Sequence, residues 1–385
     1  MVVTSQAMRQ LAFALLAMLA CAGRQIAPDP PGRPAISLAW RSALHRQHPL
    51  VGAVWDARNG RFVDEGSLRA AAAAARYLLL GEVHDNPDHH LLEEVLMRAA
   101  SKVEPRPAAV FEMLDQDRQA AIDAALAAPD AGPDALARTV DWTHSGWPSF
   151  ALYRPVFAAA FAARLPIVAA GLPRAVVGHL FHRGTSELPP RVREILDRAG
   201  APPPEVLVEL RQEMSASHCG ELPEKMLDSL VLVQRARDAL LAERLLAGGE
   251  RAVLVAGSGH VRVDRGVPAY VRREAPGREV LAIAFVEVSD AGRSPADYAS
   301  EFGEETLPFD LVVFTPAAER EDPCRGLREK MRSLRDHTAG GGTGSGFPAR
   351  PSEPIEPRRA LGSTRLNQRP SGGPSASGPS ALRVS

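Results

Sequence analysis

The chain has 385 residues, enough for about two domains, and its 45% hydrophobic content is ample for a core. The net charge of −1 gives no electrostatic reason to expect nucleic acid as a partner. The three cysteines, Cys21, Cys219 and Cys324, are too few for a disulfide scaffold. These totals are typical of a globular protein and leave its function to be argued from motifs.

The N-terminus has the layout of an export signal. Residues 11–20 form an apolar run of ten, too short to span a bilayer as an ordinary helix, between a region with Arg9 and Cys21. With the small Ala20 before Cys21, the pattern resembles a bacterial lipoprotein signal, in which the cysteine is lipidated and becomes the new N-terminus. Met18 departs from the leucine usual there, and an ordinary cleaved signal is the alternative.

The composition divides the chain into five expected parts. If Cys21 is lipidated, Ala22 after it favours the outer membrane of a Gram-negative cell, on the periplasmic or surface side. From about residue 338 the composition becomes Gly, Ser, Pro and Arg, which is typical of disorder. We expect a lipoprotein-type signal over 1–21, a Pro-rich tether over 22–45, an α/β core over 46–175 and 249–320, a helical cap over 176–248 and a disordered tail over 336–385.

The stretch 77–90 looks central to the fold. Residues 77–80 have the length of a buried strand, and Gly81, Glu82 and His84 follow at once. Asn86-Pro87 then turns the chain, and Asp88 is a good N-cap for the helix after it. Strand, polar tip and helix in this order are how open α/β sheets present chemistry at the carboxyl ends of their strands.

The same pattern recurs downstream. The run 108–111 leads into Glu112, 166–170 ends at Gly171, and 252–256 ends before His260. If these strands are parallel neighbours, Glu82, His84, Glu112 and His260 converge at one edge of the sheet, called the rim below. Such a set suits general acid–base catalysis, mixed oxygen and nitrogen ligation of a divalent metal, or cofactor binding.

Other elements are expected on either side of this pattern. Asn59-Gly60 between two apolar runs predicts a hairpin, whose simplest role is to cap the sheet. Residues 279–288 make a good strand, and 310–314 the last one, at an edge of the sheet.

An aromatic stripe follows a loop with Asp141, Trp142 and His144. Phe150, Tyr153, Phe157 and Phe161 lie three and four apart, which predicts one helical face. That face is either an aromatic core stripe or the side on which Tyr153 meets a pocket. Since tyrosine phenolate is an accepted haem ligand, Tyr153 is the best-placed candidate for one.

Residues 174–248 look wholly helical. His218 beside Cys219 indicates either a metal or cofactor contact or, more commonly, a capped turn. Gln234, Arg237 and Asp238 lie on a long helix, where a run of charges is either a solvated face or part of a site. We name His218 and Arg237, with Tyr153, as candidate cofactor contacts. The expected fold is therefore α/β, with a mostly parallel sheet flanked by helices and a small all-helical cap inserted.

Together these motifs resemble the ChaN-like haem-binding lipoproteins, in the superfamily that includes the Tiki proteases and erythromycin esterases. The resemblance covers about residues 50–290. It rests on Leu80-Gly81-Glu82-Val83-His84-Asp85-Asn86, Phe111-Glu112-Met113, Asp141-Trp142, Tyr153-Arg154-Pro155, His218-Cys219-Gly220, Gln234-Arg235-Ala236-Arg237-Asp238, Gly257-Ser258-Gly259-His260 and Gly266-Val267-Pro268.

The resemblance implies a lipid-anchored, exported protein linked to haem and iron uptake, with haem bound through a tyrosine and paired haems at a dimer interface. In the enzyme branches the corresponding glutamates and histidines form the catalytic or metal site, here Glu82, His84, Glu112 and His260. The favoured hypothesis is a membrane-anchored haem-binding protein. A hydrolase, metal-dependent or not, using the rim residues is the runner-up, and a tethered partner-binding module is third.

Overall fold

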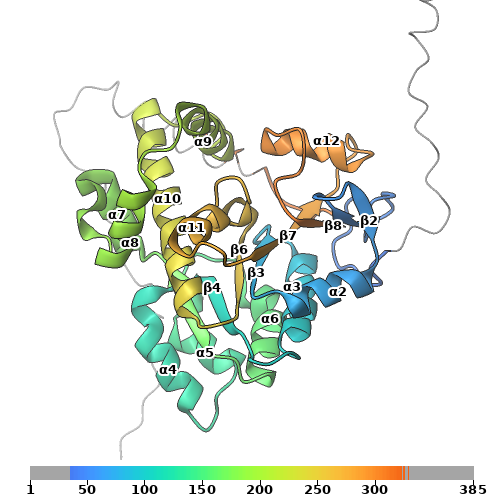
Figure 1. Cartoon of the computed structure of the whole chain (residues 1–385), viewed down its shortest axis with the longest axis horizontal. Helices are drawn as coiled ribbons and strands as arrows, with labels where there is room; N and C mark the ends of the chain where they lie inside the picture. The colour runs from blue at the N-terminus through green and yellow to red at the C-terminus, as the bar shows by residue number, and fades with distance from the viewer. Residues whose placement is uncertain (1–34, 323, 326–327, 329–385) are drawn as a thin grey trace, which may run out of the picture. The chain divides into compact units, whose positions relative to one another are not determined.

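The computed structural model describes residues 35–322, 324–325 and 328 (Figure 1). The predictions for the signal 1–21, for lipidation of Cys21 and for the tail 336–385 lie outside the described residues, as does most of the tether. Within the described part, no helix is both long and apolar enough to cross a bilayer. The described residues up to 322 belong to one compact unit.

In the described part of the chain, eight strands form one sheet in the order β2-β1-β8-β7-β3-β6-β4-β5. Strand β3 pairs in parallel with β6 and β7, β4 with β5 and β6, and β7 with β8, so the expected mostly parallel sheet is confirmed. The strands are β1 (Val54–Asp56), β2 (Arg61–Val63), β3 (Tyr77–Glu82), β4 (Ala108–Asp115), β5 (Ile167–Gly171), β6 (Ala252–Gly257), β7 (Val280–Glu287) and β8 (Leu311–Thr315).

Helices cover both faces of this sheet (Figure 1). One face packs on α2 (Glu65–Ala74), α3 (Pro87–Ala100), α4 (Gln119–Ala127), α5 (Pro133–Thr139) and α6 (Phe150–Ala162). The other packs on α7 (Arg174–Arg183), α8 (Pro190–Ala199), α10 (Glu224–Ala247), α11 (Val267–Glu274) and α12 (Pro295–Ala299). Because strand side chains alternate, Leu78 and Leu80 join the first core while Tyr77 and Leu79 join the second.

The segment expected to be wholly helical is helical. Its long helices are α7, α8, α9 (Pro204–Ser217) and α10. Helix α10 contacts strands β4, β5 and β6, and its Val233, Ala236 and Leu240 belong to the same core as the sheet. This helix therefore serves as part of the sheet's covering layer and carries polar residues of its middle part toward the rim.

Two sequence expectations were wrong. Strand β8 is not at an edge, because the hairpin of β1 and β2 pairs with it in antiparallel fashion and extends the sheet beyond it. Asp88 does not cap α3. The cap is Asn86, whose side chain accepts from the Asp88 N–H, while the Asp88 carboxylate accepts from the backbone N–H groups of Arg41 and Ser42.

The described residues contain one disulfide, between Cys219 and Cys324. Cys219 lies in the turn between α9 and α10, and Cys324 lies beyond β8, 105 residues later in the sequence. The bond is therefore a single long-range tie and not a scaffold. It also means that the Cys219 sulfur is not a free metal ligand.

Candidate functional site

The site begins where β3 ends. Glu82, the last residue of the strand, is buried, and its Oε1 lies 2.7 Å from Nδ1 of His84. The His84 side chain is 35% exposed, and its Nε2 makes no hydrogen bond to any described residue. Since Nδ1 donates to Glu82, Nε2 is the atom that a ligand or substrate can reach. Burial alone would lower the pKa of His84, but Glu82 outweighs it and the pKa is raised.

Beneath this pair lies a buried group from two helices. The Tyr153 hydroxyl, on α6, donates to Glu82 Oε1 at 3.1 Å and lies 3.4 Å from His84 Nδ1. His90, on α3, places Nδ1 2.9 Å from Glu82 Oε2 and 3.0 Å from Glu93 Oε2, and its ring packs on the Tyr153 ring at 4.1 Å. Burial would raise the pKa of Glu82, but His90 and His84 hold it well below its usual range. Burial and the Glu82 charge together raise the pKa of Glu93.

A second cluster follows β4 and β6. His260, in the single turn after β6, places Nε2 3.3 Å from Glu112 Oε1 and Nδ1 2.7 Å from Asp238 Oδ1. Gln234 lies 3.2 Å from the same Nδ1. Burial would lower the pKa of His260, but Glu112 and Asp238 raise it to about 10. Burial and the neighbouring carboxylates raise the pKa of Asp238 to about 6. The two carboxylates therefore favour the protonated form of His260.

Glycine at two positions lets these groups approach. Glu112 Oε2 accepts from the Gly257 N–H at 2.9 Å, and a Cβ at Gly257 would lie 3.1 Å from His84 Nε2. A Cβ at Gly81 would meet Val261 Cγ2 at 2.3 Å, so only glycine permits the turn after β6 to close over β3. Gly257 thus separates the two clusters and leaves room around His84 Nε2.

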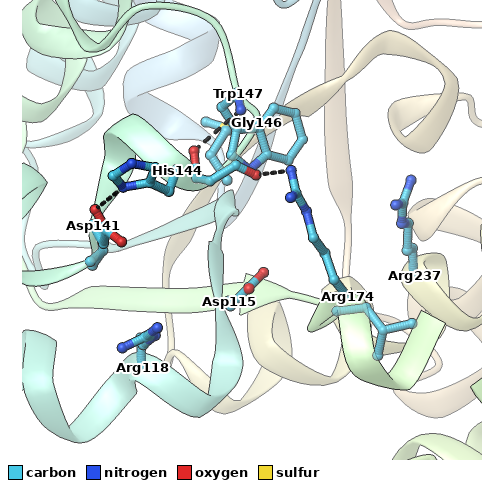
Figure 2. Close-up of a pocket in the computed structure, with 12 residues that line it drawn as sticks. Asp115, Arg118, Asp141, His144, Gly146, Trp147, Arg174 and Arg237 are labelled. Carbon is cyan, nitrogen blue, oxygen red and sulfur yellow. Dashed lines mark hydrogen bonds and ion pairs between the residues drawn. The ribbon is translucent and has the colours of Figure 1, made fainter. Parts of the chain in front are cut away.

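A pocket of roughly 310 Å³ opens beside the rim (Figure 2). The Trp147 ring packs edge-on against His84 at 4.8 Å and forms one wall. Figure 2 shows Asp115 between Arg118 and Arg174, with Arg237 beyond Arg174. Burial and Asp117 raise the pKa of Asp115 despite these cations. The remaining lining residues are Met113, Val140, Asp141, His144, Ser145, Gly146 and Leu172.

The pocket offers cationic groups for an anionic ligand. Arg174 donates to the backbone carbonyl of Ser145. Neither Arg118 nor Arg237 makes a hydrogen bond or ion pair with a described residue. Guanidinium groups bind carboxylates and phosphates in paired, charge-assisted hydrogen bonds, so two unengaged ones favour such a group here.

The structure brings Glu82, His84, Glu112 and His260 to one rim, as their strand-end positions indicated. Arg237 lines the adjoining pocket. His218 does not join them: its Nδ1 lies 2.8 Å from the Met214 carbonyl, within the turn after α9. Of the two alternatives for the aromatic stripe, packing is borne out, since Tyr153 and Phe157 are fully buried, although the Tyr153 hydroxyl also reaches Glu82.

Sequence reasoning left the role of Gln234 and Asp238 open and missed other residues of the site. Asp238 and Gln234 reach His260 from α10, and their spacing with Arg237 puts all three on one helix face. His90 and Glu93 form an i, i+3 pair on α3, a polar pair among apolar positions that could have signalled an inward-facing polar contact. Trp147 gave no signal beyond its place in the aromatic loop.

The fold and rim define an α/β protein with a polar site at the carboxyl ends of parallel strands. Residues 68–271, more than half of the chain, match the family described as haem-binding uptake, Tiki superfamily, ChaN. The chain belongs to this family. No curated protein matches it.

Two solved structures resemble the chain. ChaN of Campylobacter jejuni, solved with cofacially bound haem, is 20% identical, with a TM-score of 0.55 over 68% of this chain and 95% of ChaN. The erythromycin esterase EreC, in its open conformation, is 13% identical over 74% of this chain and 100% of EreC, with a TM-score of 0.40. At these identities the likeness to ChaN establishes the fold alone.

Proposed function

We propose that this protein binds haem at the rim and takes part in haem or iron uptake. Its membership of a haem-binding uptake family supports this, and the similar ChaN binds haem cofacially. The observation that carries the proposal is a half-exposed imidazole, His84, beside a pocket that combines an indole with three guanidinium groups.

The residues present fit the needs of haem. The iron requires an axial ligand from a histidine, tyrosine, cysteine or methionine side chain. The propionates require cations, which Arg118, Arg174 and Arg237 offer. Trp147 offers an aromatic face beside His84. When bound, haem would supply an iron centre, and the chain's own residues would hold and orient it.

Two side chains are candidates for the axial ligand. The proposed Tyr153 is fully buried, its hydroxyl donates to Glu82, and burial together with the Glu82 charge raises its pKa. Ligation by its phenolate therefore requires the hydroxyl to leave Glu82 and reach solvent. His84 needs no such change, because Nδ1 is held by Glu82 and Nε2 is free. We therefore propose Tyr153 and His84 as alternative axial ligands, which the absorption spectrum of the haemin complex distinguishes.

Haemin titration followed by absorption tests the proposal. Saturable binding is expected for the wild-type protein. If Tyr153 is the ligand, Tyr153→Phe abolishes a high-spin tyrosinate-type spectrum and His84→Ala keeps it. If His84 is the ligand, the wild-type spectrum is that of imidazole-ligated haem, which His84→Ala abolishes and Tyr153→Phe keeps. A folded wild-type protein without a saturable spectral change would overturn the haem proposal.

A hydrolase is the second candidate, favoured by the pairing of Glu82 with His84. Glu82 holds Nδ1–H, so His84 Nε2 is oriented to take a proton from water, with Glu82 stabilising the imidazolium that forms. Replacing His84 with alanine should then lower the rate of ester or peptide hydrolysis by about 10²–10⁴-fold. Equal rates for His84→Ala and wild type would exclude this role.

Export, lipid anchoring at Cys21 and dimerisation complete the proposal. The Cys219–Cys324 disulfide supports export, because disulfides persist in oxidising compartments. Mass spectrometry of the mature N-terminus should find acylated Cys21, and Cys21→Ala should release the protein from the membrane fraction. Sedimentation with and without haemin should report a dimer if haems pair between two chains. Unmodified Cys21 would leave the ordinary cleaved signal as the better explanation.

A further inference from the structure

Glu82, His90 and Glu93 form a closed polar group beneath the rim. One oxygen or nitrogen from each lies within 4.8 Å of the others, and all three side chains are fully shielded from solvent. Glu82 comes from the end of β3 and the other two from α3, so two regular elements hold the group. A buried polar group of this kind requires partners for every atom.

The group is short of hydrogen-bond donors. His90 Nδ1 is the nearest donor to both carboxylates, at 2.9 Å from Glu82 Oε2 and 3.0 Å from Glu93 Oε2. Only the second contact has hydrogen-bond geometry. Glu82 Oε2 and Glu93 Oε1 are therefore buried without a hydrogen-bond partner among the described residues. Each carboxylate thus has one unpartnered oxygen, and both carboxylates lie within 3.0 Å of the same imidazole nitrogen, which favours a cation among the three side chains.

The other nitrogen of His90 is already engaged. Nε2 lies 3.0 Å from the His84 carbonyl oxygen and donates to it. A metal-binding histidine usually makes such a contact with its second nitrogen, because the contact fixes the tautomer and the ring orientation. Because Nε2 is engaged, Nδ1 is the nitrogen that can bind a metal, and it lies close to both carboxylates.

We propose that Glu82, His90 and Glu93 bind a divalent cation of the zinc type, separately from any haem at the rim. One dication, two carboxylates and one neutral imidazole sum to zero charge, which suits a site without solvent. Tetrahedral bonds of roughly 2 Å place ligand atoms about 3.3 Å apart, so Nδ1 and each carboxylate oxygen would separate by only about 0.4 Å from their present 2.9 and 3.0 Å. Glu82 would then make two kinds of contact: Oε2 binds the cation, and Oε1 accepts hydrogen bonds from His84 and Tyr153.

The test uses full-length protein refolded with Zn²⁺, or with Co²⁺ as a coloured substitute, and then separated from free ion. We expect about one ion per chain and visible Co²⁺ absorption of a nitrogen–oxygen site. Glu93→Gln, which preserves shape and removes the charge, should weaken binding by at least about 100-fold. Glu94→Gln is the matched control, because Glu94 pairs with Arg98 on the solvent side of α3.

Three results would overturn the proposal: no retained ion in folded wild-type protein, equal retention by Glu93→Gln and Glu94→Gln, or thiolate ligands around the zinc. X-ray absorption of the wild-type zinc protein distinguishes oxygen and nitrogen ligands from sulfur, so the proposal stays testable even if Glu93→Gln does not fold. Haemin titration of the same samples reports the proposed haem function independently.

Discussion

His84 Nδ1 lies 2.7 Å from Glu82 Oε1, and this contact fixes which nitrogen of His84 meets a ligand. Glu82 is itself fixed by the Tyr153 hydroxyl and by His90, so the orientation of one half-exposed ring depends on two helices that pack behind the strand. Glu82 and His90 are buried, whereas the His84 side chain is 35% exposed and is the part of this arrangement that a ligand can reach.

Gly257→Ala should block access to His84 Nε2. The backbone φ of −57° at Gly257 suits alanine, but its Cβ would lie 3.1 Å from Nε2. We expect haemin affinity to fall about tenfold, roughly 1.4 kcal/mol, with little change in melting temperature. Gly178→Ala is the control, because a Cβ there meets nothing within 4 Å, and it should leave haemin affinity unchanged. Wild-type affinity in Gly257→Ala would place haem away from His84.

Arg237→Gln should weaken haemin binding by about tenfold or more, because a charge-assisted hydrogen bond contributes about 1.5–3 kcal/mol. The comparison ligand is haemin dimethyl ester, which lacks carboxylates and should bind the variant and the wild type equally. Arg98→Gln, on the exposed side of α3, serves as the control variant. An equal loss for both ligands would mean that Arg237 acts through folding and not through the propionates.

Tyr153→Phe should destabilise the fold by about 1–3 kcal/mol, because it removes a buried donor from the charged Glu82. Urea unfolding measures the change. Tyr77→Phe is the control: its hydroxyl donates to the neutral Gly249 carbonyl at 3.1 Å and accepts from Arg278 at 3.3 Å. Because Arg278 is exposed to solvent, a smaller loss of about 1 kcal/mol is expected. A loss no larger in Tyr153→Phe than in Tyr77→Phe would show that the contact with Glu82 is weak.

Stability should fall at alkaline pH through His260. Its pKa is raised from 6.5 to about 10 in the folded protein, so its contribution is full below about pH 6.5, declines as pH rises and is lost above about pH 10. His260→Gln should flatten the pH dependence of the unfolding free energy between these limits. The quantity to compare is the unfolding free energy of the wild type minus that of His260→Gln at each pH. A difference that does not change from pH 6.5 to 10 would contradict the raised pKa.

Loss of the Cys219–Cys324 disulfide should cost about 2–4 kcal/mol, because it closes a loop of 105 residues. Cys324→Ser and the double Cys219→Ser/Cys324→Ser variant should lose similar amounts, since either removes the same bond. Chemical denaturation with and without reductant measures both. A double variant much less stable than the single one would indicate a separate role for Cys219.

The sequence predicted most of the sheet and the rim for one reason. Strands β3, β4 and β6 end in or lead into polar residues, so Glu82, Glu112 and His260 could be placed together before any pairing was known. The position of β8 could not be predicted in this way, because it depends on a hairpin about 250 residues earlier in the chain pairing with it.

The buried side-chain contacts could be predicted less well from the sequence. The local pattern around Asn86-Pro87-Asp88 permits either polar residue as the helix cap, and the choice follows from a distant segment, Arg41 and Ser42, that engages Asp88. The spacing of Gln234, Arg237 and Asp238 could place them on one helix face, but Asp238 meets His260 because α10 packs across the strand ends, which is a tertiary relationship. The disulfide likewise joins two cysteines whose proximity arises only in the folded chain.

The most direct test of haem binding at the rim is the position of the iron in crystals grown with haemin, located by anomalous diffraction at the iron edge. We predict an iron peak within bonding distance of His84 Nε2 or, after movement of its hydroxyl, of Tyr153, with the propionates toward Arg118, Arg174 and Arg237. An iron peak elsewhere on the protein, or none in crystals of the saturated protein, would contradict this account.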